Sequence, residues 1–179
     1  METDWRLKIG KISPSVYVHS REYHRMLPVG MDIAVVTTGI EEITEGDLSD
    51  AREEAVTAIR RLDNRSVDCI IAGGAPVYAL DDDGEAMLDR VREETTAPIA
   101  SSLQSNVDAL HAVGAESVLA VTPYPPARNR DREAFLEASG FDVVDIGGFE
   151  STGEVASFVD TPPTEFAGLA RRMARDTDE

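Results

Sequence analysis

Residues 118–146, VLAVTPYPPARNRDREAFLEASGFDVVDI, contain a strand, a helix and a second strand in immediate succession. Val118–Thr122 and Val143–Ile146 are short, apolar and rich in β-branched residues, as are the strands of a parallel sheet covered on both faces. Arg130–Ala138, between them, has its apolar residues at helical spacing. This order predicts a right-handed crossover, with a ligand crevice at the carboxyl ends of the strands.

The same alternation runs through the rest of the chain. Further strand-like runs lie at Leu7–Ile12, Ile33–Thr37, Val67–Ala72 and Ile99–Ser101. Further helical patterns lie at Asp50–Leu62, Gly84–Glu94, Leu103–Val113 and Thr164–Arg175. Helices that alternate with strands predict an α/β fold of three layers, in which a parallel sheet lies between two layers of helices.

An internal repeat divides the chain. PVGMDIAV at 28–35 lies over ASGFDVVD at 138–145, which matches Gly30 with Gly140 and Asp32 with Asp142. In the first copy the third strand is Val67–Ala72, whereas in the second copy it would begin where the sequence stops. We therefore expect two half-domains, 1–101 and 102–179, the second lacking its third strand. A terminal helix with a frayed acidic end is the alternative interpretation of the last residues.

The composition excludes several classes of protein. Of 179 residues, 42% are hydrophobic and 28% charged, so the chain can bury a core. Its 17 basic and 34 acidic residues give a net charge of −17, which argues against nucleic acid as a partner. No run approaches the roughly 18 apolar residues of a membrane-spanning helix, so we expect no membrane partner. The opening METDWRLKIG has no signal-peptide pattern, which predicts a cytoplasmic protein.

The charge also suggests adaptation to salt. Lys8 and Lys11 are the two lysines, against 15 arginines. Molar salt shortens the screening length to about 3 Å and so relieves repulsion between carboxylates. Scarce lysine and excess acid predict a halophilic protein, although the same numbers also describe an acidic protein from ordinary surroundings.

Three segments carry a family resemblance over almost the whole chain. They are KIGKISPS at 8–15, VDCIIAGGAPVY at 67–78, and Ala109–Phe141 with its neighbours. Their order and spacing resemble the aspartate/glutamate racemase superfamily, in the branch of arylmalonate decarboxylases and maleate cis-trans isomerases. The resemblance implies two pseudo-symmetric, flavodoxin-like half-domains with the active site between them. It also implies isomerase, racemase or decarboxylase chemistry on a small mono- or dicarboxylate, with no metal and no organic cofactor.

The cysteines that the resemblance implies are absent. Isomerase and racemase members use two cysteines, one in each half, as acid, base or nucleophile. The first position falls on Gly74, as in the decarboxylases, and the second belongs to the strand that this chain lacks. Cys69 lies five residues before Gly74 inside a strand, where it is expected to be a small buried hydrophobe. We therefore assign no catalytic residue and expect impaired activity.

The candidate substrate-binding residues follow predicted strands. Tyr124 matches the family's substrate-contacting tyrosine, and its hydroxyl can donate to a carboxylate or an enediolate oxygen, with Thr122 as a weaker companion. The alternative is a loop tyrosine that covers apolar surface. The backbone amides of Gly73, Gly74 and Ala75 predict an anion-binding concavity, but glycine at a tight strand exit explains the same residues.

The remaining polar candidates are weaker. Ser15 can donate one hydrogen bond to a substrate, or it is a turn serine. Ser101 is expected to cap the helix that follows it. His19, His24 and His111 form no ligand pattern, so no metal is expected.

Two classes of function remain open. One is a cofactor-independent isomerase, racemase or decarboxylase acting on a small carboxylate. The other is a noncatalytic carboxylate-binding or assembly module, the product of a split gene, whose sheet is completed in a homo-oligomer or by a complementing chain.

Overall fold

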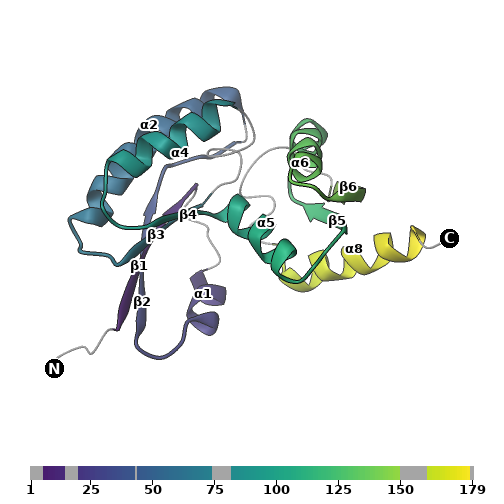
Figure 1. Ribbon diagram of the computed structural model, residues 1–179, viewed down its shortest axis with the longest axis horizontal. Coiled ribbons are helices and arrows are strands. Elements are labelled where there is room, and N and C mark those ends of the chain that lie inside the picture. The colour runs from purple at the N-terminus through teal and green to yellow at the C-terminus, as the bar shows by residue number, and fades with distance from the viewer. Residues whose placement is uncertain (1–5, 15–19, 43, 74–81, 150–160, 178–179) are drawn as a thin grey trace. The chain divides into compact units, whose positions relative to one another are not determined.

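A computed structural model gives the structure of the chain and describes residues 6–14, 20–42, 44–73, 82–149 and 161–177. Strands and helices alternate as the sequence predicts (Figure 1). The chain divides into two compact units. Unit 1 comprises residues 1–40 and 45–104, and unit 2 comprises residues 41–44 and 105–179.

Unit 1 contains a four-stranded parallel sheet in the order β2-β1-β3-β4. Its strands are β1 (Leu7–Ser13), β2 (Met31–Thr37), β3 (Cys69–Ala72) and β4 (Ile99–Ser101). Its helices are α1 (Ser20–Met26), α2 (Glu45–Asp63) and α4 (Asp82–Glu93). Because β1 pairs with β2 on one side and with β3 on the other, it is an inner strand of the sheet.

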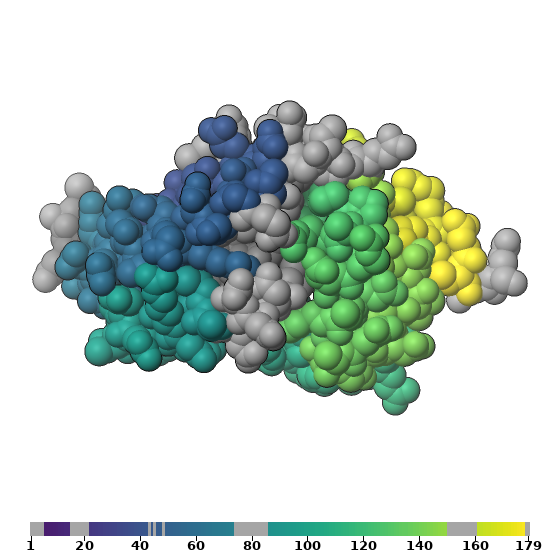
Figure 2. Space-filling view, turned by 90° about the horizontal axis from the view of Figure 1, so that it is seen from above, coloured from purple at the N-terminus to yellow at the C-terminus, as the bar shows by residue number. Residues whose placement is uncertain are grey.

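The two faces of this sheet are covered by different helices. Gly10 of β1 faces Leu62 of α2, whereas the next residue, Lys11, reaches Tyr23 of α1. Successive side chains of a strand point to opposite faces, so α2 and α1 lie on opposite sides of β1. Helices α2 and α4 contact each other, and Figure 2 shows them side by side at the surface in blue and teal. The buried apolar side chains of β1, β3, α2 and α4 form the core between sheet and helices.

Unit 2 contains the two-stranded parallel sheet β5-β6. Its elements are β5 (Ser117–Thr122), α6 (Pro126–Ala138), β6 (Asp142–Gly148) and α8 (Pro163–Asp176), and α5 (Ser102–Ala112) leads into it. Its core is formed by Val107, Leu136 and Phe141. Helix α8 packs against both strands, much as α2 packs against β1 and β2.

Several local predictions can be compared with this fold. Each predicted strand and helix has a counterpart within a few residues, but α1 has none in the sequence analysis. Helix α6 begins at Pro126, four residues before the predicted start, because proline is well suited to the first turn of a helix. Ser101 accepts a hydrogen bond from the Gln104 amide at 3.0 Å, which confirms its predicted capping of α5.

The missing third strand of the second half-domain stays a prediction. Within the described residues β5 pairs with β6 alone, but residues 150–160 and 178–179 lie outside that part of the chain. No helix in the described ranges has the length and apolar character needed to cross a membrane.

Candidate functional site

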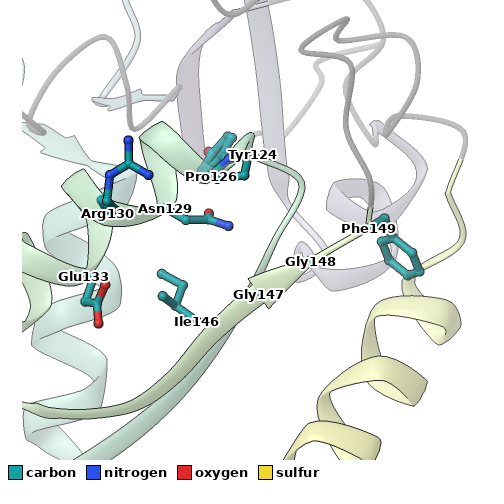
Figure 3. A pocket seen from close by; sticks show the side chains of 9 residues that line it. All are labelled: Tyr124, Pro126, Asn129, Arg130, Glu133, Ile146, Gly147, Gly148 and Phe149. Atoms are coloured by element: carbon teal, nitrogen blue, oxygen red, sulfur yellow. The ribbon is translucent and has the colours of Figure 1, made fainter.

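A cleft of about 530 Å³ lies in unit 2 where β5 and β6 end (Figure 3). The first turns of α6 form one wall, and the glycines at the end of β6 form another. The lining residues are Tyr124, Pro126, Asn129, Arg130, Glu133, Ile146, Gly147, Gly148 and Phe149. The carboxyl ends of parallel strands are where α/β folds bind their ligands, so this cleft is the candidate site.

Thr122, the last residue of β5, forms hydrogen bonds to two residues that line the cleft. Its buried hydroxyl donates a hydrogen bond to Asn129 Oδ1 and accepts one from the Tyr124 amide at 3.2 Å. These bonds fix Asn129 on α6 and the turn that carries Tyr124. Figure 3 shows Asn129 extending from α6 into the cleft. Because Oδ1 of Asn129 already accepts the bond from Thr122, the side-chain NH₂ group of Asn129 is the part that can donate to a ligand.

Tyr124 supplies a second donor. Burial raises the pKa of its phenol above the ordinary value, while the nearby Arg132 charge acts in the opposite direction. The hydroxyl therefore remains protonated at neutral pH. A protonated phenol can donate a hydrogen bond to a carboxylate oxygen.

Two charged side chains complete the cleft. Arg130 and Glu133 lie one turn apart on α6, and both line the cleft (Figure 3). The guanidinium of Arg130 can bind a carboxylate through two parallel hydrogen bonds. The Glu133 carboxylate repels a second anion, so the cleft favours a ligand whose negative charge lies toward Arg130.

The glycines of the cleft are required by close packing. A Cβ on Gly148 would overlap the Thr122 carbonyl, and one on Gly147 would lie 3.0 Å from the Met173 methyl group. Glycine therefore lets the end of β6 approach β5 and leaves the floor of the cleft without side chains.

Gly73 occupies a tight strand exit in unit 1. Its amide donates to the Ile12 carbonyl at 2.9 Å, and an added Cβ would lie 2.5 Å from the same oxygen. The Gly73 amide is thus engaged in the sheet. The other candidates, Gly74, Ala75 and Ser15, lie outside the described residues.

A buried lysine near Gly73 was not singled out in the sequence. Lys11 is 4% exposed, and its ammonium donates to the Tyr23 hydroxyl at 2.6 Å and lies 3.9 Å from the centre of that ring. Burial lowers the pKa of Lys11 to about 8 and raises the pKa of Tyr23. The available signal is a lysine in the middle of the predicted strand Leu7–Ile12, in a chain with two lysines.

Cys69 does not have the surroundings of a reactive thiol. It is half-buried within β3, where burial and the neighbouring Asp68 charge raise the pKa of its thiol. Within the described ranges no group of three or more His, Cys, Asp or Glu side chains is placed to hold a metal ion.

The fold and the cleft together define an α/β protein with parallel strands and a small polar site at their carboxyl ends. No protein-family model matches the sequence, and no curated protein matches it significantly. Solved structures specify the fold further. The Nocardia farcinica maleate cis-trans isomerase, as a cysteine-to-serine mutant with a covalently bound succinylcysteine intermediate, matches with a TM-score of 0.81 and 18% identity. That match covers 93% of this chain and 72% of the isomerase.

Two further solved structures have a similar fold. The maleate isomerase Iso of Pseudomonas putida S16, with maleate, has a TM-score of 0.79 and 16% identity over 91% of this chain and 71% of its own. Unliganded arylmalonate decarboxylase has a TM-score of 0.72 and 19% identity over 95% of this chain and 74% of its own. The resemblance to these two families that the sequence indicates is confirmed at the level of the fold.

Proposed function

We propose that this chain binds a small mono- or dicarboxylate in the Tyr124 cleft, and that it is related to the cofactor-independent isomerases, racemases and decarboxylases. We propose further that its turnover is slight or absent. The observation that carries the binding proposal is that Tyr124, Asn129 and Arg130 all line one cleft at the strand ends.

The three groups complement a carboxylate. The phenol of Tyr124 and the amide of Asn129 are neutral donors, and the Arg130 guanidinium supplies the charge. Thr122 acts on the ligand through its bonds to Asn129 and to the Tyr124 amide. Arylmalonate and maleate, named with the similar structures, are small carboxylates of the size that such a cleft admits.

The argument for weak turnover rests on the thiol. In the Nocardia farcinica isomerase a cysteine carries the covalent succinyl intermediate. Here Cys69 is the single cysteine, and its raised pKa disfavours the thiolate that such chemistry requires. Hydrogen bonding and positioning then remain as the means of catalysis, and both act without a nucleophile.

A noncatalytic carboxylate-binding or assembly module is the second candidate. The same absence of a reactive thiol favours it, as does the unpaired edge of β5 within the described residues. The two candidates differ in one measurable property, since conversion of the ligand, however slow, agrees with the first candidate alone.

Calorimetric titration with maleate, aspartate, glutamate and phenylmalonate tests binding, and product analysis of the same mixtures tests turnover. We expect Tyr124→Phe to weaken binding about tenfold, because one hydrogen bond to a charged group is lost. Arg130→Gln should weaken it at least as much. Tyr23→Phe, in unit 1, is the matched control and should bind as the parent chain does.

The outcomes separate the proposals. Equal binding by the parent chain and by both cleft variants would refute the Tyr124 cleft as the site. Rapid turnover that disappears in Tyr124→Phe would refute the proposal of slight activity and the noncatalytic alternative together. Binding without product in the parent chain would support the module.

A further inference from the structure

The Tyr124 cleft contains one positive and one negative side chain that are not paired with each other. Arg130 and Glu133 both line it, and neither has an ion-pair partner among the described residues. Arg128 and Asp131 have the same spacing on the same helix and form an ion pair at 3.0 Å. The helix therefore allows such a pair, yet Figure 3 shows the side chains of Arg130 and Glu133 extending in different directions.

The two charges give the cleft two chemically different ends. At one end the Arg130 guanidinium lies with the neutral donors of Tyr124 and Asn129, and all three suit a carboxylate. At the other end an ionised Glu133 accepts hydrogen bonds and donates none. Glu133 therefore favours an uncharged donor, such as an amide or a hydroxyl. Figure 3 shows Ile146 extending from β6 into the cleft, where it offers an apolar surface to the body of a ligand.

These charges match a ligand with one carboxylate better than a ligand with two. A monocarboxylate can bind at Arg130 and place no charge near Glu133. A second carboxylate finds no other cation among the described residues that line the cleft. Two like charges about 5 Å apart repel enough to weaken binding about tenfold, when the dielectric constant lies between those of a protein surface and water. The net charge of −17 acts in the same direction.

We propose that Glu133 makes the Tyr124 cleft selective for a monocarboxylate that carries an uncharged hydrogen-bond donor at its other end, and against a dicarboxylate. This assignment rests on the carboxylate binding proposed for the cleft. Arg130 then sets the affinity for both kinds of ligand, whereas Glu133 determines the preference between them. Maleate and arylmalonate, which are named with the similar solved structures, are dicarboxylates, so the ligand class assigned to this chain differs from theirs.

Fumarate and its monoamide are the matched probes. The trans double bond holds the two ends apart in the same rigid shape, and the two compounds differ only in that an amide replaces one carboxylate. Calorimetric titration of the full chain with each, at pH 7.5 and an ionic strength of about 0.15 M, gives the two dissociation constants. We expect the monoamide to bind about tenfold more tightly than fumarate.

Glu133→Gln tests the residue, because it removes the charge and keeps the size of the side chain. It should tighten the binding of fumarate about tenfold and change that of the monoamide by less than about twofold, since the glutamine carbonyl still accepts a hydrogen bond. Glu137→Gln is the matched control. It changes the net charge equally, at an exposed position of α6 outside the lining of the cleft, and should keep the preference of the parent chain.

Arg130→Gln should weaken the binding of both compounds by a similar factor, because both place a carboxylate at that end. The ratio of the two affinities compares two ligands on one chain, so a fraction of unfolded protein in any variant leaves this ratio unchanged.

Two results would overturn the selectivity and leave carboxylate binding in place. One is fumarate binding as tightly as its monoamide to the parent chain, and the other is an equal change of the affinity ratio in Glu133→Gln and Glu137→Gln. If neither compound binds to the parent chain or to Glu133→Gln, carboxylate binding in the cleft is itself refuted, and the selectivity with it.

Discussion

Replacing Lys11 by methionine should stabilise the protein at neutral pH. Lys11 is 4% exposed, and burial lowers its pKa from 10.5 to about 8. Below pH 8 the buried amine is charged, and the lowered pKa means that this charge reduces the free energy of unfolding by about 3 kcal/mol. Loss of the hydrogen bond to Tyr23 offsets about 1 kcal/mol. We therefore expect Lys11→Met to raise the free energy of unfolding by about 2 kcal/mol at pH 7.

The substitution should also flatten the pH dependence of stability. Between pH 8 and 10.5 the unfolded chain holds the proton of Lys11 more tightly than the folded chain does, so the free energy of unfolding rises with pH in this window. The rise amounts to about 2 kcal/mol from pH 8 to pH 10. Tyr23 acts in the opposite sense above pH 10, because its raised pKa lets the unfolded chain lose that proton first.

Urea denaturation at constant potassium chloride and at pH 7, 8, 9 and 10 measures both effects. Lys8→Met is the matched control, because Lys8 lies in the same strand with its side chain exposed. That variant should keep the slope of the parent chain. The reasoning fails if Lys11→Met retains the rise between pH 8 and 10, or if it is less stable than the parent chain at pH 7.

Three further outcomes can be measured on the folded chain. Gly73→Ala should lower the free energy of unfolding by about 1–3 kcal/mol, because its Cβ would lie 2.5 Å from the Ile12 carbonyl oxygen. Gly168→Ala in α8, where the nearest atom is 3.6 Å away, should raise it by up to about 1 kcal/mol, and an equal effect of the two substitutions in urea denaturation would contradict the packing argument. Cys69 should react with iodoacetamide at pH 7.5 about tenfold more slowly than in the urea-unfolded chain, because burial raises its pKa, and mass spectrometry showing equal rates would disprove this. Raising potassium chloride from about 0.1 M to about 1 M should raise the melting temperature in calorimetry, because the screening length falls from about 10 Å to about 3 Å around a net charge of −17, whereas a lower melting temperature would exclude this salt effect.

The elements that the sequence predicts well are those with a strong local signal. The sequence predicts a strand over Val118–Thr122, and β5 spans Ser117–Thr122, because a short run rich in β-branched residues favours a strand over a helix. The capping of α5 by Ser101 also depends on residues close in sequence. Tyr124 could be placed in the candidate site for a related reason, since the end of a parallel strand fixes where the next residues lie.

The features that the sequence did not reveal depend on distant contacts. The sequence pattern predicts a helix that begins at Arg130, but the two prolines before it set the start at Pro126, and Asn129 and Arg130 then line the cleft. The partnership of Lys11 with Tyr23 crosses 12 residues and requires α1 to cover β1, and α1 itself has no strong apolar pattern. Charged residues on a helix signal a solvated surface in the sequence, and only packing shows which of them line a site.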